Sequence, residues 1–380
     1  MITLRPIKFI KSFQCDVLIY DDICQKWLAK SLPEECERAC ISTRFSIPLL
    51  LSFRFLWCLI WRLRPLRPGK RHYLFEYLSV LIETTQPKVL ISGADNNFVV
   101  AEISQSYPEV WVILVQTALR DTNQGFPTEI KLPTYWSFGQ CERSMFTKLG
   151  VSCEELVPIG SIKLGYALAF SSNKEFTQKD ICFVSTLRPE RVVDQSQSLL
   201  NAIDAVSDSL FRYACQYAEQ HHLRLRVLGK SRESHLHTKE HSHYTRLSDG
   251  YPFEFVSAEK EVRELDTYFA LFASDLIIHN ASTLGFEALA AGKRVLFGAS
   301  ISPGLIEDWG IQAYFDQLPS FVCVQTDDYR HFEKKVDELR KLSDRQYASA
   351  ILAASKAVIA QDEPPPHKKI EKAIGEFLNS

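Results

Sequence analysis

Short apolar runs alternate with longer segments of helical periodicity along the first part of the chain. Continuous Val, Ile and Leu runs occur at residues 16–20 (DVLIY), 88–92 (KVLIS) and 111–115 (WVILV). Uninterrupted runs of this length are typical of parallel strands that are covered on both faces. Residues 73–84 and 98–105 have the spacing of helices. The pattern therefore predicts strand–helix units around a buried parallel sheet.

The same alternation starts again near residue 180. Strands are expected at residues 181–185, 223–228, 253–256, 275–278 and 295–297. Helices are expected at residues 197–220, 261–273, 284–291, 328–342 and 368–378. Residues 231–249 are polar and rich in histidine, and we predict an exposed loop there. Its HxH pairs, His235/His237 and His241/His243, lack the cysteines and the fixed spacing of a metal site.

Two successive series of this kind predict an α/β protein with two Rossmann-like domains, whose parallel sheets face each other across a cleft. A chain of 380 residues is also long for a single core. We place the first domain at 1–165 and the second at 166–360. Residues 361–380 are expected to form a final helix that crosses back to the first domain.

Composition narrows the functional class. Apolar residues make up 46% and charged residues 24% of the chain, which is typical of a globular protein. The formal net charge of −2 argues against a nucleic-acid-binding protein. Ten scattered cysteines without a CxxC pair indicate reduced thiols in the cytoplasm rather than disulfides or structural zinc.

The segment with the clearest chemistry is residues 275–297 (DLIIHNASTLGFEALAAGKRVLF). A predicted strand leads through Ser282 and Thr283 into a helix, and a helix start at the carboxyl end of a parallel strand is an anion site. Gly285 permits close approach of the backbone. Glu287, one turn on, is placed to accept hydrogen bonds from ribose hydroxyls. The alternative is a simple helix cap followed by a surface carboxylate.

Three further side chains are predicted to line the same cleft. Lys230 and Arg188 each follow a strand at its carboxyl end, where a cation can pair with a phosphate or a sugar carboxylate. His279 leaves the strand directly at the proposed anion site and is a candidate for phosphate binding or proton transfer. Each has a plainer alternative, namely a surface cation or a structural histidine.

Group transfer also needs a carboxylate as a base or nucleophile. Asp95 lies in the turn after residues 88–92, at the expected edge of the first domain. Asp249 and Glu254 flank the loop before residues 253–256. The pattern does not choose among these three, and each is also compatible with a turn or surface position.

The segment DLIIHNASTLGFEALAAGKRV resembles the donor-binding segment of bacterial surface-carbohydrate and O-antigen biosynthesis proteins, a group related to the GT-B β-Kdo transferases. Further similar pieces are DVLIYD at 16–21, SGADNNF at 92–98, QTALR at 116–120, Phe138-Gly139, GSIKL at 160–164 and FVSTLR at 183–188. Thr117-Ala118 stand where the family has Asn-Gly, so the resemblance departs in that loop.

The resemblance implies a GT-B glycosyltransferase with the acceptor on domain 1–165 and the nucleotide-sugar donor on domain 166–360. The implied donor is a CMP-linked acidic sugar, Kdo above all, or another nucleotide sugar, used without a metal or cofactor. The implied acceptor is a lipid-linked glycan of a lipopolysaccharide, O-antigen or capsule. An epimerase, a polyol-phosphate transferase and a non-catalytic assembly protein are the alternatives.

An acceptor of this kind places the enzyme at the inner face of the plasma membrane. The basic segment 62–71 suits peripheral contact with anionic lipid. The apolar stretch 47–61 before it is too short to span a bilayer and contains Arg54. We expect most of its apolar residues to be buried in the first domain.

Overall fold

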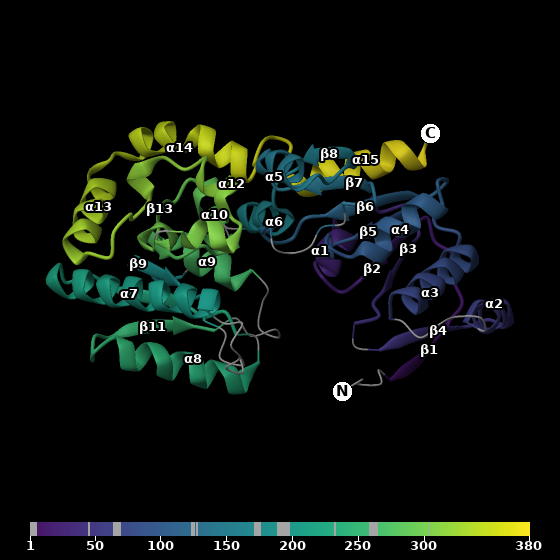
Figure 1. The fold of residues 1–380 in the computed structure, drawn as a ribbon, viewed down its shortest axis with the longest axis horizontal. Coiled ribbons are helices and arrows are strands. Elements are labelled where there is room, and N and C mark those ends of the chain that lie inside the picture. The colour runs from purple at the N-terminus through teal and green to yellow at the C-terminus, as the bar shows by residue number, and fades with distance from the viewer. Residues whose placement is uncertain are drawn as a thin grey trace.

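The protein has two parallel β-sheets that lie at opposite ends of an elongated molecule (Figure 1). The structure is a computed structural model. It describes residues 6–44, 46–63, 70–122, 126, 128–170, 176–187, 198–231, 233–257, 265–302 and 304–380.

The N-terminal half is built on a six-stranded parallel sheet with the strand order β3-β2-β5-β6-β7-β8. Its strands are β2 (Val17–Tyr20), β3 (Arg38–Ile41), β5 (Val89–Ser92), β6 (Trp111–Val115), β7 (Leu132–Ser137) and β8 (Cys153–Pro158). All residues of β2 and β5 are buried, because helices cover both faces of the sheet. The strands predicted from the three apolar runs are confirmed.

Five helices surround this sheet. They are α1 (Gln25–Lys30), α3 (Lys70–Thr85), α4 (Phe98–Ser106), α5 (Cys141–Leu149) and α6 (Ile162–Phe170). The helix α4 begins where the side chain of Asn97 accepts a hydrogen bond from the Val99 amide. The helix α5 ends at Gly150, whose positive φ of 69° turns the chain into β8.

A two-stranded parallel pair, β1 (Ile7–Lys11) and β4 (Ile47–Leu51), and the helix α2 (Phe53–Leu63) form the outer end of this half (Figure 1). The prediction that most apolar residues of 47–61 are buried was wrong. In α2, Phe55 and Leu59 are buried. Its large exposed side chains are Phe53, Trp57, Ile60 and Trp61.

The C-terminal half has a five-stranded parallel sheet with the order β11-β10-β9-β12-β13. Its strands are β9 (Lys179–Val184), β10 (Leu225–Leu228), β11 (Phe253–Val256), β12 (Ser274–His279) and β13 (Arg294–Phe297). Its helices are α7 (Ser198–Gln220), α8 (Ser234–Leu247), α9 (Asp266–Phe272), α10 (Thr283–Ala290), α11 (Leu305–Trp309), α12 (Gln312–Phe315), α13 (Tyr329–Lys341) and α14 (Asp344–Val358).

The helix α8 corrects the prediction of a histidine-rich loop at 231–249. Its buried face consists of Leu236, His237, Glu240 and Tyr244, which recur at helical spacing. Two of these four are polar and have their partners inside the protein, so hydrophobic periodicity does not reveal the helix.

The last helix, α15 (Pro366–Leu378), lies against the N-terminal half, on the side of β7 and β8 (Figure 1). The ring of Phe377 lies 4.8 Å from that of Trp111, centroid to centroid. A single core of buried apolar residues runs from the N-terminal sheet through the junction into the C-terminal sheet. The two halves are therefore in direct contact.

All ten cysteines lie within the described residues and are thiols rather than disulfides, as the sequence predicted. In the part of the chain that the structure covers, no helix is both long and apolar enough to cross a membrane.

Candidate functional site

The proposed anion site lies where β12 leads into α10. The buried strand ends at His279, and Ser282 takes the extended conformation of an N-cap residue (φ −84°, ψ 140°). Within the described residues its hydroxyl makes no capping bond. Instead the Ser282 amide donates to Nδ1 of His279 over 3.1 Å. The turn is thus held by the histidine rather than by a hydroxyl cap.

His279 is fully buried beneath the start of α10. Burial lowers its pKa to about 3, so the ring is neutral, and its Nδ1 is an acceptor. A Cβ atom at Gly285 would lie 2.1 Å from Nε2 of His279, so glycine is needed there to accommodate the ring. The predicted roles of His279 in phosphate binding and proton transfer do not fit this buried position, and Gly285 makes room for the histidine itself.

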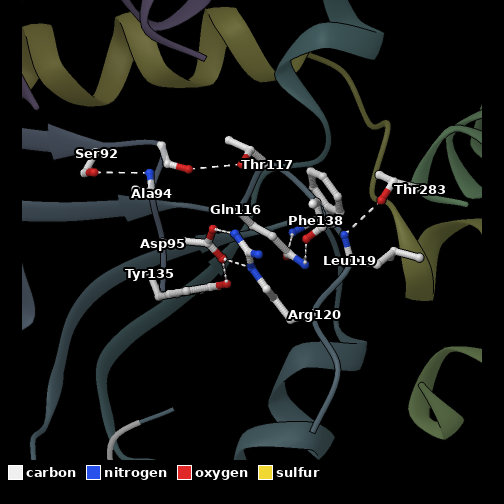
Figure 2. A network of polar contacts seen from close by, with 12 residues as sticks. Ser92, Ala94, Asp95, Gln116, Thr117, Leu119, Arg120, Tyr135, Phe138 and Thr283 are labelled. Carbon is white, nitrogen blue, oxygen red and sulfur yellow. Dashed lines mark hydrogen bonds and ion pairs between the residues drawn. The ribbon is translucent and has the colours of Figure 1, made fainter. Parts of the chain in front are cut away.

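The first turns of α10 face the N-terminal half. The amide of Leu119, in the loop after β6, donates to Oγ1 of Thr283 over 3.1 Å (Figure 2). Ser161, which follows β8, donates its hydroxyl hydrogen bond to Glu287. Two elements of the N-terminal half therefore bind the two α10 side chains that the sequence singled out.

Glu287 is buried at this contact. It also accepts hydrogen bonds of 2.9 Å from the hydroxyl of Tyr268 in α9. Burial raises the pKa of the Glu287 carboxyl, and the hydrogen bonds from Ser161 and Tyr268 and the charge of Lys163 offset this only in part. Glu287 is therefore a buried carboxyl held by hydroxyls rather than a solvated surface charge.

Asp95 lies at the carboxyl end of β5 and is also buried. It forms an ion pair with Arg120, whose Nε is 2.8 Å from Oδ2, and accepts a hydrogen bond from the Tyr135 hydroxyl (Figure 2). Burial lowers the pKa of Arg120, but the hydrogen bonds and charge of Asp95 outweigh it and leave the pKa above its usual value. Asp95 is committed to this cluster, a geometry that does not suit the catalytic role predicted for it.

A second buried cluster joins the two halves. Glu142, in the first turn of α5, accepts hydrogen bonds from Gln116 Nε2 at 2.6 Å and from the Tyr314 hydroxyl of α12 at 2.9 Å. The Arg120 amide donates to the same hydroxyl. Burial raises the pKa of Glu142 to about 7, against the lowering effect of these hydrogen bonds.

Sequence analysis missed several of these residues. Gln116 and Ser161 lay within segments noted for their family resemblance, whereas nothing in the local pattern marked Glu142, Tyr268 or Tyr314.

A small cavity opens at the junction on the side of the N-terminal half. It is lined by Cys24, Gln116, Thr117, Phe138, Ser161, Ile162 and Lys163. Its accessible volume of about 10 Å³ is far below the roughly 300–1,000 Å³ of a typical small-molecule site. Together with the contacts to Thr283 and Glu287, this means that the two halves are closed on each other around the start of α10.

The remaining candidates lie elsewhere on the C-terminal sheet or outside the described residues. Lys230 is exposed after β10, where its amide donates to Glu240. Arg188 lies outside the described residues. Glu254, near the amino end of β11, pairs with Arg226 and Lys179 at 3.1 Å each. Asp249 precedes that strand and is exposed.

Asp249 and Glu254, which the sequence offers as candidate catalytic carboxylates, lie at the end of the sheet opposite to the start of α10. Because the sheet is parallel, the amino end of β11 is at the other edge of the sheet from the start of α10. Burial of Glu254 would raise its pKa, but hydrogen bonds and charge from Arg226 and Lys179 lower it overall. The structure therefore does not bring these two carboxylates to the junction.

The histidines of α8 have protein partners. Nε2 of His237 is hydrogen bonded to the Ser231 carbonyl, and Nε2 of His243 lies 2.8 Å from Oδ1 of Asp208. Across the residues placed in the structure, no cluster of three or more His, Cys, Asp or Glu side chains is arranged to hold a metal ion.

Comparison with known proteins gives one family match. The model of a family described as "putative O-antigen biosynthesis protein" matches residues 150–364, more than half of the chain. No curated protein sequence matches the chain.

Several solved structures are similar over nearly the whole chain. The UDP-GlcNAc 2-epimerase of Neisseria meningitidis, bound to UDP-GlcNAc, has 11% identity and a TM-score of 0.54, with 97% of this chain and 100% of that one covered. The wall teichoic acid polymerase TagF has 11% identity and a TM-score of 0.52, with 96% and 89% covered.

Sucrose-phosphate synthase of Thermosynechococcus elongatus has 11% identity and a TM-score of 0.50, with 99% and 98% covered. At such low identity these likenesses establish the fold alone. The fold is GT-B, as the resemblance implied.

Proposed function

This chain belongs to the O-antigen biosynthesis family whose model matches it, and we propose on that premise that it is a glycosyltransferase. It would transfer a sugar from a nucleotide donor to a growing surface polysaccharide or lipopolysaccharide. The observation that most supports the proposal is the contact between the start of α10 and the N-terminal half, at Thr283 and Glu287. A transferase needs its donor site to face the acceptor domain, and α10 does so.

The donor would bind with its phosphate at the first turn of α10. The first amides of a helix have no acceptor four residues back, although the Gly285 amide donates to the Ser282 carbonyl, and the helix dipole favours an anion. In this arrangement Leu119 and Ser161 are hydrogen bonded to Thr283 and Glu287. The two halves must therefore separate before the donor enters. Separation would free Thr283 for the phosphate and Glu287 for the ribose hydroxyls.

We further propose that the donor is a CMP-linked acidic sugar such as Kdo and that no metal or cofactor takes part. The acceptor would be a lipid-linked glycan at the cytoplasmic face of the plasma membrane. The proposed membrane contact through 62–71 lies largely outside the described residues, which resume at residue 70. Lys230, exposed after β10, is a candidate to pair with the donor phosphate.

A panel of nucleotides and nucleotide sugars tests the proposal. A nucleotide that binds only the folded protein, at a hundred times its Kd, stabilises it by about 2.7 kcal/mol. We expect CMP to raise Tm more than UDP or GDP, and CMP to be released when a CMP-sugar and an acceptor glycan are supplied. Release of UDP from a UDP-sugar, without release of CMP from a CMP-sugar, would support the transferase but show that its donor is a UDP-sugar. Interconversion of UDP-GlcNAc with its epimer would favour the epimerase instead.

Variants at α10 locate the site. Thr283→Val and Glu287→Gln are expected to weaken the nucleotide-induced rise in Tm, because they remove a hydroxyl and a carboxyl acceptor. Glu376→Gln, on the exposed side of α15, is the matched control and should respond like the unmodified protein. If the nucleotide-induced rise in Tm were unchanged in both α10 variants, the donor would have to bind elsewhere.

The closed junction also favours a second candidate, a non-catalytic assembly protein that retains the GT-B fold. Its α10 side chains would then serve only to join the halves. Small-angle X-ray scattering with and without nucleotide separates the two candidates. A transferase should change its radius of gyration when the donor binds, whereas the assembly protein should show neither this change nor any nucleotide-dependent Tm.

A further inference from the structure

The elements β1, β4 and α2 lie at the outer end of the N-terminal half (Figure 1), and they carry large apolar side chains that are exposed. We call them the outer apolar surface, and it consists of Ile7, Phe9, Leu51, Phe53, Trp57, Ile60 and Trp61. Each is more than half exposed, and Phe53 is 82% exposed. The residues belong together, because β1 pairs with β4 and α2 packs beside β4. A set of neighbouring exposed apolar side chains this large on a protein surface indicates a binding site.

The helix α2 divides its side chains between two environments. Phe55 and Leu59 are buried, and Phe55 meets Tyr77 of α3 edge to face, with 6.0 Å between ring centroids. Phe53, Trp57 and Trp61 recur every four residues and therefore share the outer face. Successive rings are 5.9 and 6.0 Å apart. The helix is thus fixed to the protein on one side and presents an aromatic row on the other.

Basic residues predominate in the segments that form this surface. Residues 1–15 and 44–75 contain ten Lys and Arg and no Asp or Glu, although the whole chain has a net charge of −2. Among the described residues, Lys11 and Arg54 are exposed beside the apolar side chains, whereas Lys8, also exposed, lies on the other face of β1 from Ile7 and Phe9. Arg62 is instead paired with Glu76 and Glu83 of α3. A surface that combines exposed aromatics with unopposed positive charge matches an anionic lipid surface.

We propose that the outer apolar surface docks on an anionic lipid bilayer, with α2 parallel to the membrane plane. The indole rings of Trp57 and Trp61 lie at headgroup depth, where an apolar body and an N–H donor are both accommodated. Lys11 and Arg54 contact lipid phosphates. With eleven residues, α2 is too short to cross the bilayer, so the contact is peripheral. This inference extends the membrane contact of the proposed function from 62–71 to the described residues of β1, β4 and α2, and its own evidence is exposure and charge.

Vesicle flotation of the full chain tests the proposal. We expect binding to mixed phosphatidylglycerol–phosphatidylcholine vesicles and much weaker binding to pure phosphatidylcholine. The double variant Trp57→Ala/Trp61→Ala should lower the partition coefficient about tenfold or more, because two interfacial anchors are removed. Leu352→Ala, an exposed apolar side chain on α14 of the C-terminal half, is the matched control and should bind normally.

A charge variant and a spectroscopic readout complete the test. Lys11→Glu/Arg54→Glu should weaken binding to anionic vesicles only, and added salt should do the same. The conservative variant Trp57→Phe/Trp61→Phe should retain most of the binding. It should also lose the blue shift of tryptophan emission that lipid causes in the unmodified protein. Circular dichroism and Tm confirm that each variant is folded.

Three results would overturn the proposal. The first is equal binding to neutral and anionic vesicles, and the second is unchanged vesicle binding by Trp57→Ala/Trp61→Ala. The third is that the unmodified protein is a dimer without lipid, whereas Trp57→Ala/Trp61→Ala is a monomer. The last would assign the surface to a second copy of the chain. Nucleotide-dependent Tm is measured without lipid, so failure of the membrane proposal leaves the proposed function testable, and the reverse also holds.

Discussion

The junction between the halves and the outer end of the N-terminal half differ in which side chains they bury and which they expose. At the junction, polar side chains such as Glu287, Asp95 and Glu142 are buried and bonded to protein partners. At the outer end, apolar side chains such as Phe53 and Trp57 face solvent. Burying a polar group without a hydrogen-bond partner and exposing a large apolar side chain to water are each unfavourable. At the junction, protein partners already compensate for the burial.

The difference shows where binding partners are still needed. A buried carboxyl that is fully hydrogen bonded contributes to holding the closed arrangement, and a ligand must displace those bonds. Covering an exposed aromatic row with an apolar surface removes it from water and is therefore favourable. We therefore expect substitutions at the junction to change folding stability, whereas substitutions at the outer end should change binding with little effect on stability.

The largest effect is expected for Asp95→Ala. This change leaves the buried guanidinium of Arg120 without its ion-pair partner, which typically costs about 3–5 kcal/mol. Urea denaturation monitored by circular dichroism measures the loss. Glu376→Ala, which breaks the exposed pair with Lys372, should cost about 0–1 kcal/mol. Equal losses for the two variants would mean that the Asp95 cluster is not a buried network.

Glu142 predicts a pH dependence of stability. Because its folded-state pKa is raised from 4.5 to about 7, the folded protein binds more protons between these values. The free energy of unfolding from this group is therefore highest below about pH 4.5 and is lost as pH rises through about 7, by roughly 3 kcal/mol. Glu142→Gln removes the dependence.

The measurement is the difference in unfolding free energy between Glu142→Gln and the unmodified protein, followed from about pH 4 to about pH 8. It should move steadily in favour of the variant. The contribution of Glu287, whose pKa is raised in both proteins, cancels in this difference. A flat difference would place the Glu142 pKa near its ordinary value.

Gly285→Ala tests the packing beneath the start of α10. The added methyl group would lie 2.1 Å from Nε2 of His279, and overpacking of this kind costs about 1–3 kcal/mol. In α15, a Cβ at Gly375 would meet Pro33 at an ordinary 3.5 Å. Gly375→Ala should therefore stabilise the protein by about 0.5–1 kcal/mol. Thermal denaturation of the pair should give shifts of opposite sign.

Sequence analysis located the elements that are buried on all sides. The apolar runs at β2, β5, β6 and β12 are long enough to identify parallel strands without further information. It failed for α8, whose buried face includes His237 and Glu240, because a polar residue with an internal partner does not contribute to hydrophobic periodicity.

For the site, the sequence identified the start of α10 but not its surroundings. The partners of Thr283 and Glu287 are Leu119 and Ser161, which are 164 and 126 residues away along the chain. Local spacing carries no information about such pairings. For the same reason Asp95 seemed available for catalysis, since its partner Arg120 belongs to a different loop.

The smallest effect is expected for Phe53→Ala at the outer end. Phe53 is 82% exposed, so its truncation removes little packing and should change the free energy of unfolding by about 0.5 kcal/mol or less. Phe55→Ala, two residues along the same helix, empties a buried position and should cost about 3–5 kcal/mol. If Phe53→Ala destabilised the lipid-free protein as strongly as Phe55→Ala, another part of the chain would have to cover the outer apolar surface in solution. If Phe53→Ala instead left stability unchanged and weakened vesicle flotation, the outer aromatic row would be shown to act in binding rather than in folding.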